Sequence, residues 1–324
     1  MALKWTFSAD RCRRRCQRQF AFREIIASHN GRDLLRREAF ILKQAKGLDL
    51  WRGLLVHGAI EHEVVPRLRA SAAVSWDEVV EWTVALARRQ FDFSESGAYR
   101  QPGMTKAKAG DAYCVLLPHV RGESVTASEF RKVLEETEKA LRNLSAMQEV
   151  WARIAGRGKY WPELLVSVEY AGARVETRID LLCFRGFSKP TIVEWKTYGE
   201  DTGGDAGLQT TLYAWALCRH PKWAVEKARD VEILEAQLLT GRLVEHRCDD
   251  KGFEELEDDL YRGVEELRVM VGTGRYEDLV LDDLAFAQSP YTCMYCAFRD
   301  PCLASGPRAV ETRELAACAQ GLLF

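Results

Sequence analysis

Three residues in the middle of the chain have the types and spacing of a metal-dependent hydrolytic centre. Asp180 lies in the apolar run RIDLL, and Glu194 and Lys196 are alternate residues of the run IVEWK. Both runs are expected to be strands, in which residues i and i+2 project to the same face. Glu194 and Lys196 therefore project together while Trp195 faces the other way, and Asp180 joins them if the two strands pair.

Two carboxylates and an ammonium in this arrangement are suited to phosphodiester hydrolysis. Carboxylate oxygens are the hard ligands that Mg²⁺ or Mn²⁺ prefers, and a lysine can stabilise charge on a phosphate or orient the attacking water. The alternative is an exposed ion pair, which such motifs form by chance in many sheets. The apolar setting of Glu194 favours the metal, because a charge that interrupts a buried strand needs a partner.

Further polar residues accompany this group at helical spacing. Gln209 and Tyr213 are four residues apart in the helix expected after the Lys196 strand, so they share one face. Upstream, His57 follows Gly53 by four residues on another expected helix. A lone helical histidine is more often structural than a metal ligand, but His57 accompanies the carboxylate and lysine motifs in the same chain.

Cysteines at the two ends of the chain form a second candidate site. Cys293, Cys296 and Cys302 stand as C-x2-C-x5-C, and a fourth ligand would come from Cys16 or Cys12. Ten cysteines in 324 residues are too dilute for a disulfide scaffold, which favours metal binding by the clustered ones. Four soft thiolates suit either a 4Fe–4S cluster or a tetrahedral zinc ion.

A run of arginines near the start is the candidate nucleic-acid surface. The net charge is −2, so any surface that binds a polyanion must be local. The candidates for phosphate contact are Arg11, Arg14, Arg15 and Arg18, which crowd around Cys16. The alternative is a solvated helix face.

Composition and periodicity predict a globular α/β chain. With 47% hydrophobic and 29% charged residues, 324 residues can bury a sizeable core. The apolar runs are much shorter than the roughly 18 residues of a membrane span, and the start MALKWTFSAD lacks the apolar core of a signal peptide, so a cytoplasmic protein is expected. Helices are predicted over 9–29, 34–68, 76–94, 127–157, 204–218 and 252–271, a loop over 94–111, an antiparallel meander over 164–170, 173–184 and 191–198, and a hairpin over 231–239 and 242–248.

In order along the chain, these motifs resemble the RecB-like branch of the PD-(D/E)XK nucleases. That branch has G-x-x-x-H on a helix, Asp on a strand, (D/E)-x-K on the next strand and Q-x-x-x-Y on a helix. The resemblance implies metal ligands at His57, Asp180 and Glu194, a catalytic Lys196, and Gln209 with Tyr213 as the last motif. Glu169, in the first strand, occupies a position where relatives often have a glutamate, but it is left out of the site.

The cysteines resemble the iron–sulfur members of that branch, which include the AddB nuclease domain and the CRISPR-adaptation exonucleases. Those proteins carry one cysteine before the nuclease motifs and three after them. The resemblance implies a 4Fe–4S cluster on Cys16, Cys293, Cys296 and Cys302, with Cys16 preferred to Cys12 although the proline expected after it is missing. Zinc is the less favoured occupant.

The resemblance implies a restriction-endonuclease-like core, a small mixed sheet flanked by helices, with a helical N-terminal elaboration and the cluster joining the termini. The expected segments are 1–32, a basic helix with the first cysteine; 33–158, a helical region with the His57 motif and a variable insertion; 159–285, the nuclease core; and 286–324, the cysteine segment and tail.

The expected function is divalent-metal-dependent DNA hydrolysis, by an exonuclease on single strands or ends, in repair, CRISPR adaptation or defence. A DNA-binding scaffold that keeps the fold without turnover, an endonuclease of the same superfamily, and an RNA-directed nuclease are the alternatives. No G-x-x-x-x-G-K-[ST] phosphate loop occurs in this sequence, so a helicase partner would be a separate chain.

Overall fold

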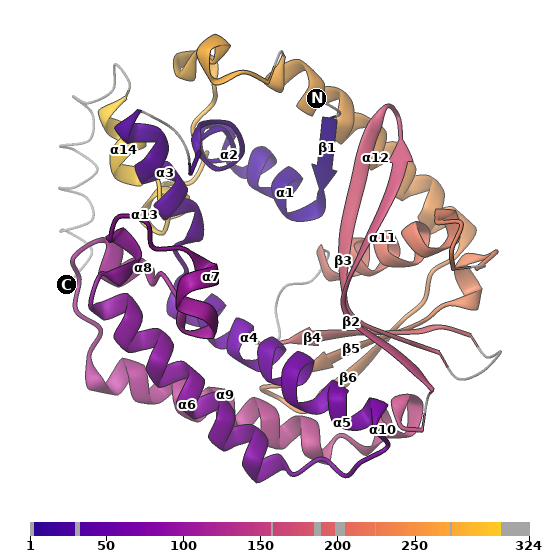
Figure 1. The fold of residues 1–324 in the computed structure, drawn as a ribbon. Coiled ribbons are helices and arrows are strands. Elements are labelled where there is room, and N and C mark those ends of the chain that lie inside the picture. The colour runs from indigo at the N-terminus through magenta and orange to yellow at the C-terminus, as the bar shows by residue number, and fades with distance from the viewer. Residues whose placement is uncertain are drawn as a thin grey trace. The chain divides into compact units, whose positions relative to one another are not determined.

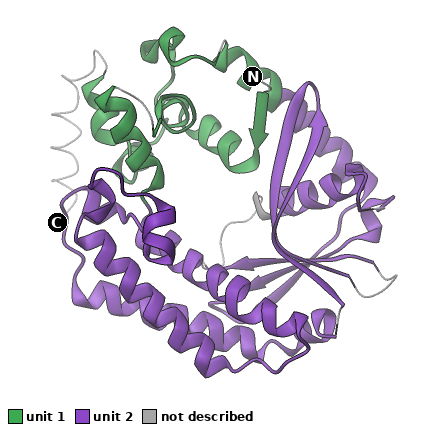
Figure 2. Cartoon of the chain, viewed as in Figure 1, with its two compact units in different colours: residues 1, 3–45, 263–324 green, residues 2, 46–262 purple. Residues whose placement is uncertain are grey.

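The computed structural model describes residues 3–29, 33–156, 158–184, 189–197, 205–223, 225–272 and 274–305. The chain forms two compact units (Figure 2). One combines residues 3–45 with the chain from 263 onward, and the other comprises residues 46–262. Residues 3–45 and the cysteine-rich segment thus belong to one unit, and the carboxylate motifs belong to the other. The described cysteines are free thiols.

The larger unit is built on a mixed sheet in the order β2-β3-β4-β5-β6 (Figure 1). Its strands are β2 (Lys159–Tyr170), β3 (Ala173–Phe184), β4 (Thr191–Lys196), β5 (Glu232–Gln237) and β6 (Arg242–His246). Neighbouring strands are antiparallel except β4 and β5, which are parallel. A parallel pair needs a crossover, and helix α11 (Asp205–Arg219) lies within that connection. The predicted meander, hairpin and mixed sheet are confirmed.

Helices cover both faces of this sheet. On one face, β4 contributes Val193 and Trp195 to a core shared with α4 (Leu48–Ala59), α6 (Trp76–Glu95) and α9 (Ala127–Ala146). On the other face, α11 contacts the side chain of Glu194 through Tyr213. The prediction that Trp195 faces away from Glu194 and Lys196 is therefore confirmed. The remaining helices of this unit are α5 (Val65–Arg69), α7 (Lys106–Ala109), α8 (Leu117–Val120) and α10 (Gln148–Ile154), and a π-helical turn spans Ile60–Val64.

The helix predicted over 127–157 is divided in two. Helix α9 begins at a capping box formed by Thr126 and Glu129, and it ends before Met147, which separates it from α10. The predicted loop 94–111 contains the short helix α7. Helix α12 (Asp250–Val271) begins in the larger unit and ends in the smaller one. No helix in the described part of the chain is both long and apolar enough to cross a membrane.

The smaller unit contains β1 (Leu3–Thr6), α1 (Phe7–Arg15), α2 (Gln17–Ala21), a π-helical turn (Phe22–Ile26), α3 (Leu34–Gln44), α13 (Pro290–Met294) and α14 (Arg299–Ala304). The prediction of a single helix over 9–29 is wrong. Thr6 caps α1 by accepting from the Ala9 N–H, and the chain is extended at Cys16, with φ −161° and ψ 109°. Cys16 ends α1 and begins α2, where its Sγ accepts a hydrogen bond from the Gln19 N–H.

Candidate functional site

Three residues of helix α4, namely Arg52, Gly53 and His57, pack against the chain at the end of strand β4. The Arg52 Nη2 donates to the carbonyl oxygen of Thr197 at 2.7 Å. A Cβ at Gly53 would lie 2.9 Å from the Thr197 Oγ1, so only glycine permits this close approach. His57, one turn later, has its Nε2 3.0 Å from the carbonyl oxygen of Trp195. The G-x-x-x-H motif thus docks a helix on the strand that carries Glu194 and Lys196.

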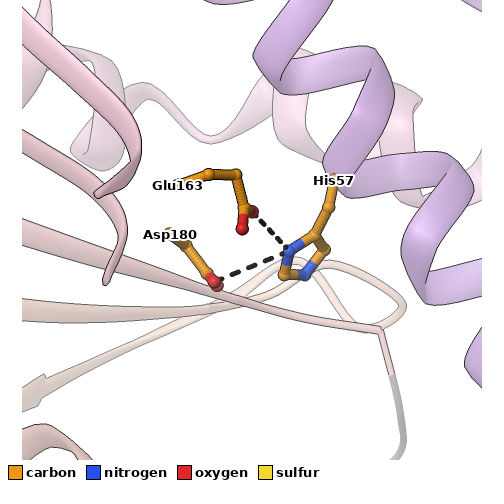
Figure 3. A group of neighbouring side chains, drawn as sticks. All are labelled: His57, Glu163 and Asp180. Atoms are coloured by element: carbon orange, nitrogen blue, oxygen red, sulfur yellow. Dashed lines mark ion pairs between the residues drawn. The ribbon is translucent and has the colours of Figure 1, made fainter. Parts of the chain in front are cut away.

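The ring of His57 is oriented so that its other nitrogen faces carboxylates (Figure 3). When Nε2 donates to the Trp195 carbonyl, Nδ1 is directed at Glu163 Oε1, 3.5 Å away, and at Asp180 Oδ1, 3.6 Å away. The three ligand atoms lie within 4.8 Å of one another. In metal-binding histidines, a hydrogen bond from the nitrogen that does not bind the metal, like that of Nε2 to the Trp195 carbonyl, fixes the tautomer. Two carboxylate oxygens and one imidazole nitrogen suit a divalent ion such as Mg²⁺ or Mn²⁺.

Glu163 is the residue of this group that the sequence reasoning missed. Glu169, the glutamate considered in the same strand, pairs with Arg174 further along the hairpin. A two-residue turn at 171–172 fixes the register of β2 and β3, and Pro162 and Leu164 pair with Leu181 and Ile179. Glu163 therefore stands opposite Asp180, and counting back from the turn would have found it.

The backbone at Glu163 is strained. Its φ is +48°, in the left-handed region that residues with a Cβ occupy at a cost of about 1–2 kcal/mol. The ladder of β2 and β3 pairs Pro162 and Leu164 but not Glu163. The strain lies at the residue whose carboxylate approaches His57. Strain of this kind is retained where surrounding structure holds a functional side chain in place.

Lys196 is held in a network with Glu194 and helix α11. The Nζ of Lys196 donates to Glu194 Oε1 at 2.7 Å and to Gln209 Oε1 at 3.0 Å. Gln209 Nε2 donates to the Tyr213 hydroxyl at 2.6 Å, and that hydroxyl donates to Glu194 Oε2 at 2.9 Å. Every member of the predicted (D/E)-x-K and Q-x-x-x-Y motifs is thus joined in one closed ring. This ring orients the ammonium and both oxygens of Glu194.

The electrostatics of the site favour a cation. Burial and the charge of Glu194 raise the pKa of Asp180 well above its ordinary value, although His57 opposes the rise. Burial alone would lower the pKa of His57, but the charges and hydrogen bonding of Asp180 and Glu163 outweigh it and raise that pKa to about 9. Without a metal, a proton on His57 compensates the carboxylates. A divalent ion would supply that compensation instead.

Four neighbouring strands, β2 to β5, each carry one carboxylate residue, and the register of the sheet places these four residues side by side across it. Glu163 stands opposite Asp180, and the pairing of Leu181 with Val193 leads on to Asp180 opposite Glu194. Glu194 is in turn paired with Glu235 on β5. The Trp195 N–H donates to Asp180 Oδ2 at 2.8 Å, which fixes that carboxylate at the end of the ladder.

The four predicted cluster cysteines line one cavity in the smaller unit. Cys16, Cys293, Cys296 and Cys302 line it together with apolar side chains that include Phe298. Burial raises the pKa of Cys293 and Cys302, and raises that of Cys296 to about 12. These thiols are therefore neutral at neutral pH unless a metal binds them. A donor set of four converging thiols fits a soft metal or an iron–sulfur cluster.

Cys12, the alternative fourth ligand, is buried but is not among the residues that line this cavity. The two positions differ because the extended backbone at Cys16 interrupts the helix predicted over 9–29, so Cys12 and Cys16 do not lie on one continuous helix. The geometry favours Cys16 over Cys12.

The arginine-rich segment is largely paired within its own unit. Asp10 accepts from Arg13 at 2.8 Å and forms an ion pair with Arg14 at 2.7 Å. Arg11 stacks on a phenylalanine ring, and Arg15 is exposed. Arg18 is 2% exposed and pairs with Asp282, so it is not accessible to a nucleic acid. Its prediction as a phosphate contact is corrected, because acidic side chains of the protein itself neutralise this run.

Two of the solved structures that match the chain are similar to it only at a low level. A protein described as SSO0001 is 17% identical, with a TM-score of 0.29 over 55% of this chain and 79% of that one. Protein VC1899 from Vibrio cholerae is 12% identical, with a TM-score of 0.24 over 70% of this chain and 57% of that one. Neither similarity is strong enough to bear on fold or function.

Family membership comes from a different comparison. No curated protein matches the chain. The family model of the PD-(D/E)XK nuclease superfamily matches residues 4–303, almost the whole length. That span includes the carboxylates, the lysine and the cysteines described above. The chain belongs to the PD-(D/E)XK nuclease superfamily.

Proposed function

We propose that the protein is a divalent-metal-dependent DNA nuclease that acts as an exonuclease on single strands or ends. The observation that carries the proposal is the convergence of His57, Glu163 and Asp180 ligand atoms within 4.8 Å, beside the hydrogen-bonded Glu194 and Lys196 pair. His57, Asp180 and Glu194 are the ligands that the family motif implies, and Glu163 is added by its position. Repair, CRISPR adaptation and defence against foreign DNA are the processes that such an activity would serve.

The residues of the site divide the work between them. A bound Mg²⁺ or Mn²⁺ would supply Lewis acidity and lower the pKa of a bound water. Lys196, held by Glu194 and Gln209, presents a fixed positive charge to the negative charge that develops on phosphorus oxygens. Tyr213 holds the second oxygen of Glu194, so that carboxylate keeps one orientation. Burial and Glu194 raise the pKa of Tyr213, which keeps its hydroxyl a hydrogen-bond donor.

We also propose that Cys16, Cys293, Cys296 and Cys302 hold a 4Fe–4S cluster with a structural role. Support comes from the thiols that line one cavity and from the apolar side chains around them. Arg11, Arg14 and Arg15 are the proposed phosphate contacts.

Cleavage assays with labelled DNA test the nuclease proposal. Linear and circular single strands and duplexes are incubated with Mn²⁺, with strands labelled at either end. We expect linear single strands to be degraded, Lys196→Ala and Asp180→Asn to lose that activity, and the exposed control Lys189→Ala to keep it. Cleavage of circular DNA would indicate an endonuclease, and degradation of RNA alone would indicate an RNA-directed enzyme. Binding without turnover would indicate a scaffold, and undiminished cleavage by Lys196→Ala would refute the proposed site.

The metal content of protein purified without oxygen tests the cofactor. A 4Fe–4S cluster gives iron, acid-labile sulfide and a broad absorbance near ~400 nm, as expected of thiolate-bound iron. Colourless protein that contains zinc would refute it.

A further inference from the structure

We propose that Arg18 is a positioning residue for the cysteine cavity, in which its guanidinium donates to the Cys302 sulfur and stabilises negative charge on a bound cluster. This inference rests on the proposed iron–sulfur cluster. It assigns Arg18 a role at the cysteine cavity in place of the predicted phosphate contact.

Arg18 is one of the most completely buried charged side chains in the smaller unit, at 2% exposure. Buried arginines require partners. Its Nη2 donates to Asp282 Oδ1 at 2.7 Å, and its Nε donates to the carbonyl oxygen of Leu284 at 3.3 Å. The guanidinium also lies over the ring of Phe286, 4.0 Å from the centroid. The side chain thus links α2 with the segment that leads to the C-terminal cysteines.

The third nitrogen of this guanidinium remains available. Arg18 Nη1 is buried and has no partner of standard hydrogen-bond geometry among the described residues. A buried N–H without an acceptor costs about 1–3 kcal/mol. The guanidinium also borders the cysteine cavity, because the Phe286 ring beneath it lines that cavity, and Cys302 is the lining thiol within its hydrogen-bonding reach. An anionic sulfur at this position would therefore satisfy the remaining donor.

The surroundings make this contact electrostatically important. Four thiolates around a cluster would concentrate negative charge in a cavity lined by apolar side chains such as Phe298 and Leu303. Arg299 also lines the cavity, but its side chain is 41% exposed and pairs with Asp300, so water screens its charge. Arg18 is shielded from water. Hydrogen bonds to the sulfurs and local charge are the main determinants of cluster potentials.

The sign of the effect follows from the charge change. Reduction adds an electron to an already anionic group, so a buried cation stabilises the reduced form more than the oxidised form. Loss of Arg18 should make the cluster harder to reduce. Loss of Asp282, the counter-ion of Arg18, should make it easier to reduce, because the guanidinium charge is then uncompensated. Opposite shifts from two partners of one ion pair would not arise from general loosening of the fold.

The experiment is a redox titration of the full-length protein, followed by absorbance. For Arg18→Gln we expect at least a tenfold decrease in the equilibrium constant for one-electron reduction, equivalent to about 59 mV. We expect a smaller shift of opposite sign for Asp282→Asn, whose site is 54% exposed and tolerant of substitution. The matched controls are Arg23→Gln, an exposed arginine of the same segment, and Asp283→Asn, the exposed neighbour. Both should titrate like the wild type.

The outcomes separate this inference from the cofactor proposal. Iron-free wild-type protein would overturn both. An iron–sulfur spectrum in the wild type, with Arg18→Gln and Asp282→Asn titrating like their controls, would overturn the role of Arg18 alone. If Arg18→Gln does not fold, Arg18→Lys replaces it. Lysine keeps the charge but lacks the planar guanidinium, so we expect a smaller decrease in the equilibrium constant for reduction. Arg18→Lys and Asp282→Asn that both titrate like their controls would then overturn the role of Arg18.

Discussion

In metal-free protein, His57 should make stability depend on pH in a defined direction. Its pKa in the folded chain is raised to about 9 from 6.5, because Asp180 and Glu163 favour the imidazolium more than burial disfavours it. A raised pKa means that the folded state binds this proton more tightly than the unfolded state. The stabilisation is therefore complete below the unfolded pKa of 6.5 and is lost as pH rises through about 9.

The size of this contribution follows from the same values. At about 1.4 kcal/mol per pH unit, the difference between 6.5 and about 9 corresponds to about 3 kcal/mol of unfolding free energy. The side chain of His57 is 23% exposed, so most of this interaction is protected from solvent screening. Glutamine cannot take up the proton, so His57→Gln removes the dependence.

Urea unfolding in the presence of a chelator measures this difference. The free energy lost by His57→Gln should be about 3 kcal/mol larger at about pH 6 than at about pH 10. His62→Gln is the control, because His62 is 60% exposed and lies in the next turn. If the curves for wild type and His57→Gln run parallel across this range, His57 does not carry the compensating proton and the assigned electrostatics are wrong.

Two pairs of substitutions test the packing of α4 and the choice of cysteine. Gly53→Ala places a methyl group 2.9 Å from Thr197 Oγ1 and should cost about 1–3 kcal/mol of stability with reduced cleavage, as measured by urea unfolding and the DNA assay. Gly58→Ala, which meets nothing within 4 Å, should gain up to about 1 kcal/mol, and equal losses for both would contradict the close contact. Cys16→Ser should abolish iron incorporation while Cys12→Ser retains it, and the reverse result in an iron assay would reassign the fourth ligand.

Sequence reasoning succeeded where the pattern is local. The alternation in IVEWK predicts that Glu194 and Lys196 face away from Trp195, and the four-residue spacing predicts that Gln209 and Tyr213 share one helix face. Both patterns depend on backbone geometry alone. The closed ring of hydrogen bonds that joins them is consistent with these predictions.

Three features of the sites depend on tertiary contacts and could not be predicted from local patterns in the sequence. The break at Cys16 is absent from helix periodicity, because the residue takes an extended conformation while its Sγ caps the next helix. The arginine run predicts that Arg18 belongs to a basic surface, but its partner Asp282 lies far along the chain and no local pattern reveals their pairing. Glu163 and Glu169 lie in the same strand, and only the register opposite Asp180 distinguishes Glu163 as the residue of the site.

The row of carboxylates explains how one sheet holds so much buried negative charge, since each member has its own compensation. His57 compensates Glu163 and Asp180, Lys196 and Tyr213 compensate Glu194, and His246 pairs with the fourth carboxylate, on β5, at 2.9 Å. These compensations differ in kind. Lys196 carries a fixed charge, whereas His57 carries one only while it is protonated. Once His57 has lost its proton, its ring nitrogen and the Asp180 carboxylate would be free to hold a divalent ion, while Gln209 holds Lys196 in place. A proton could thus be replaced by a metal without rearrangement of the lysine.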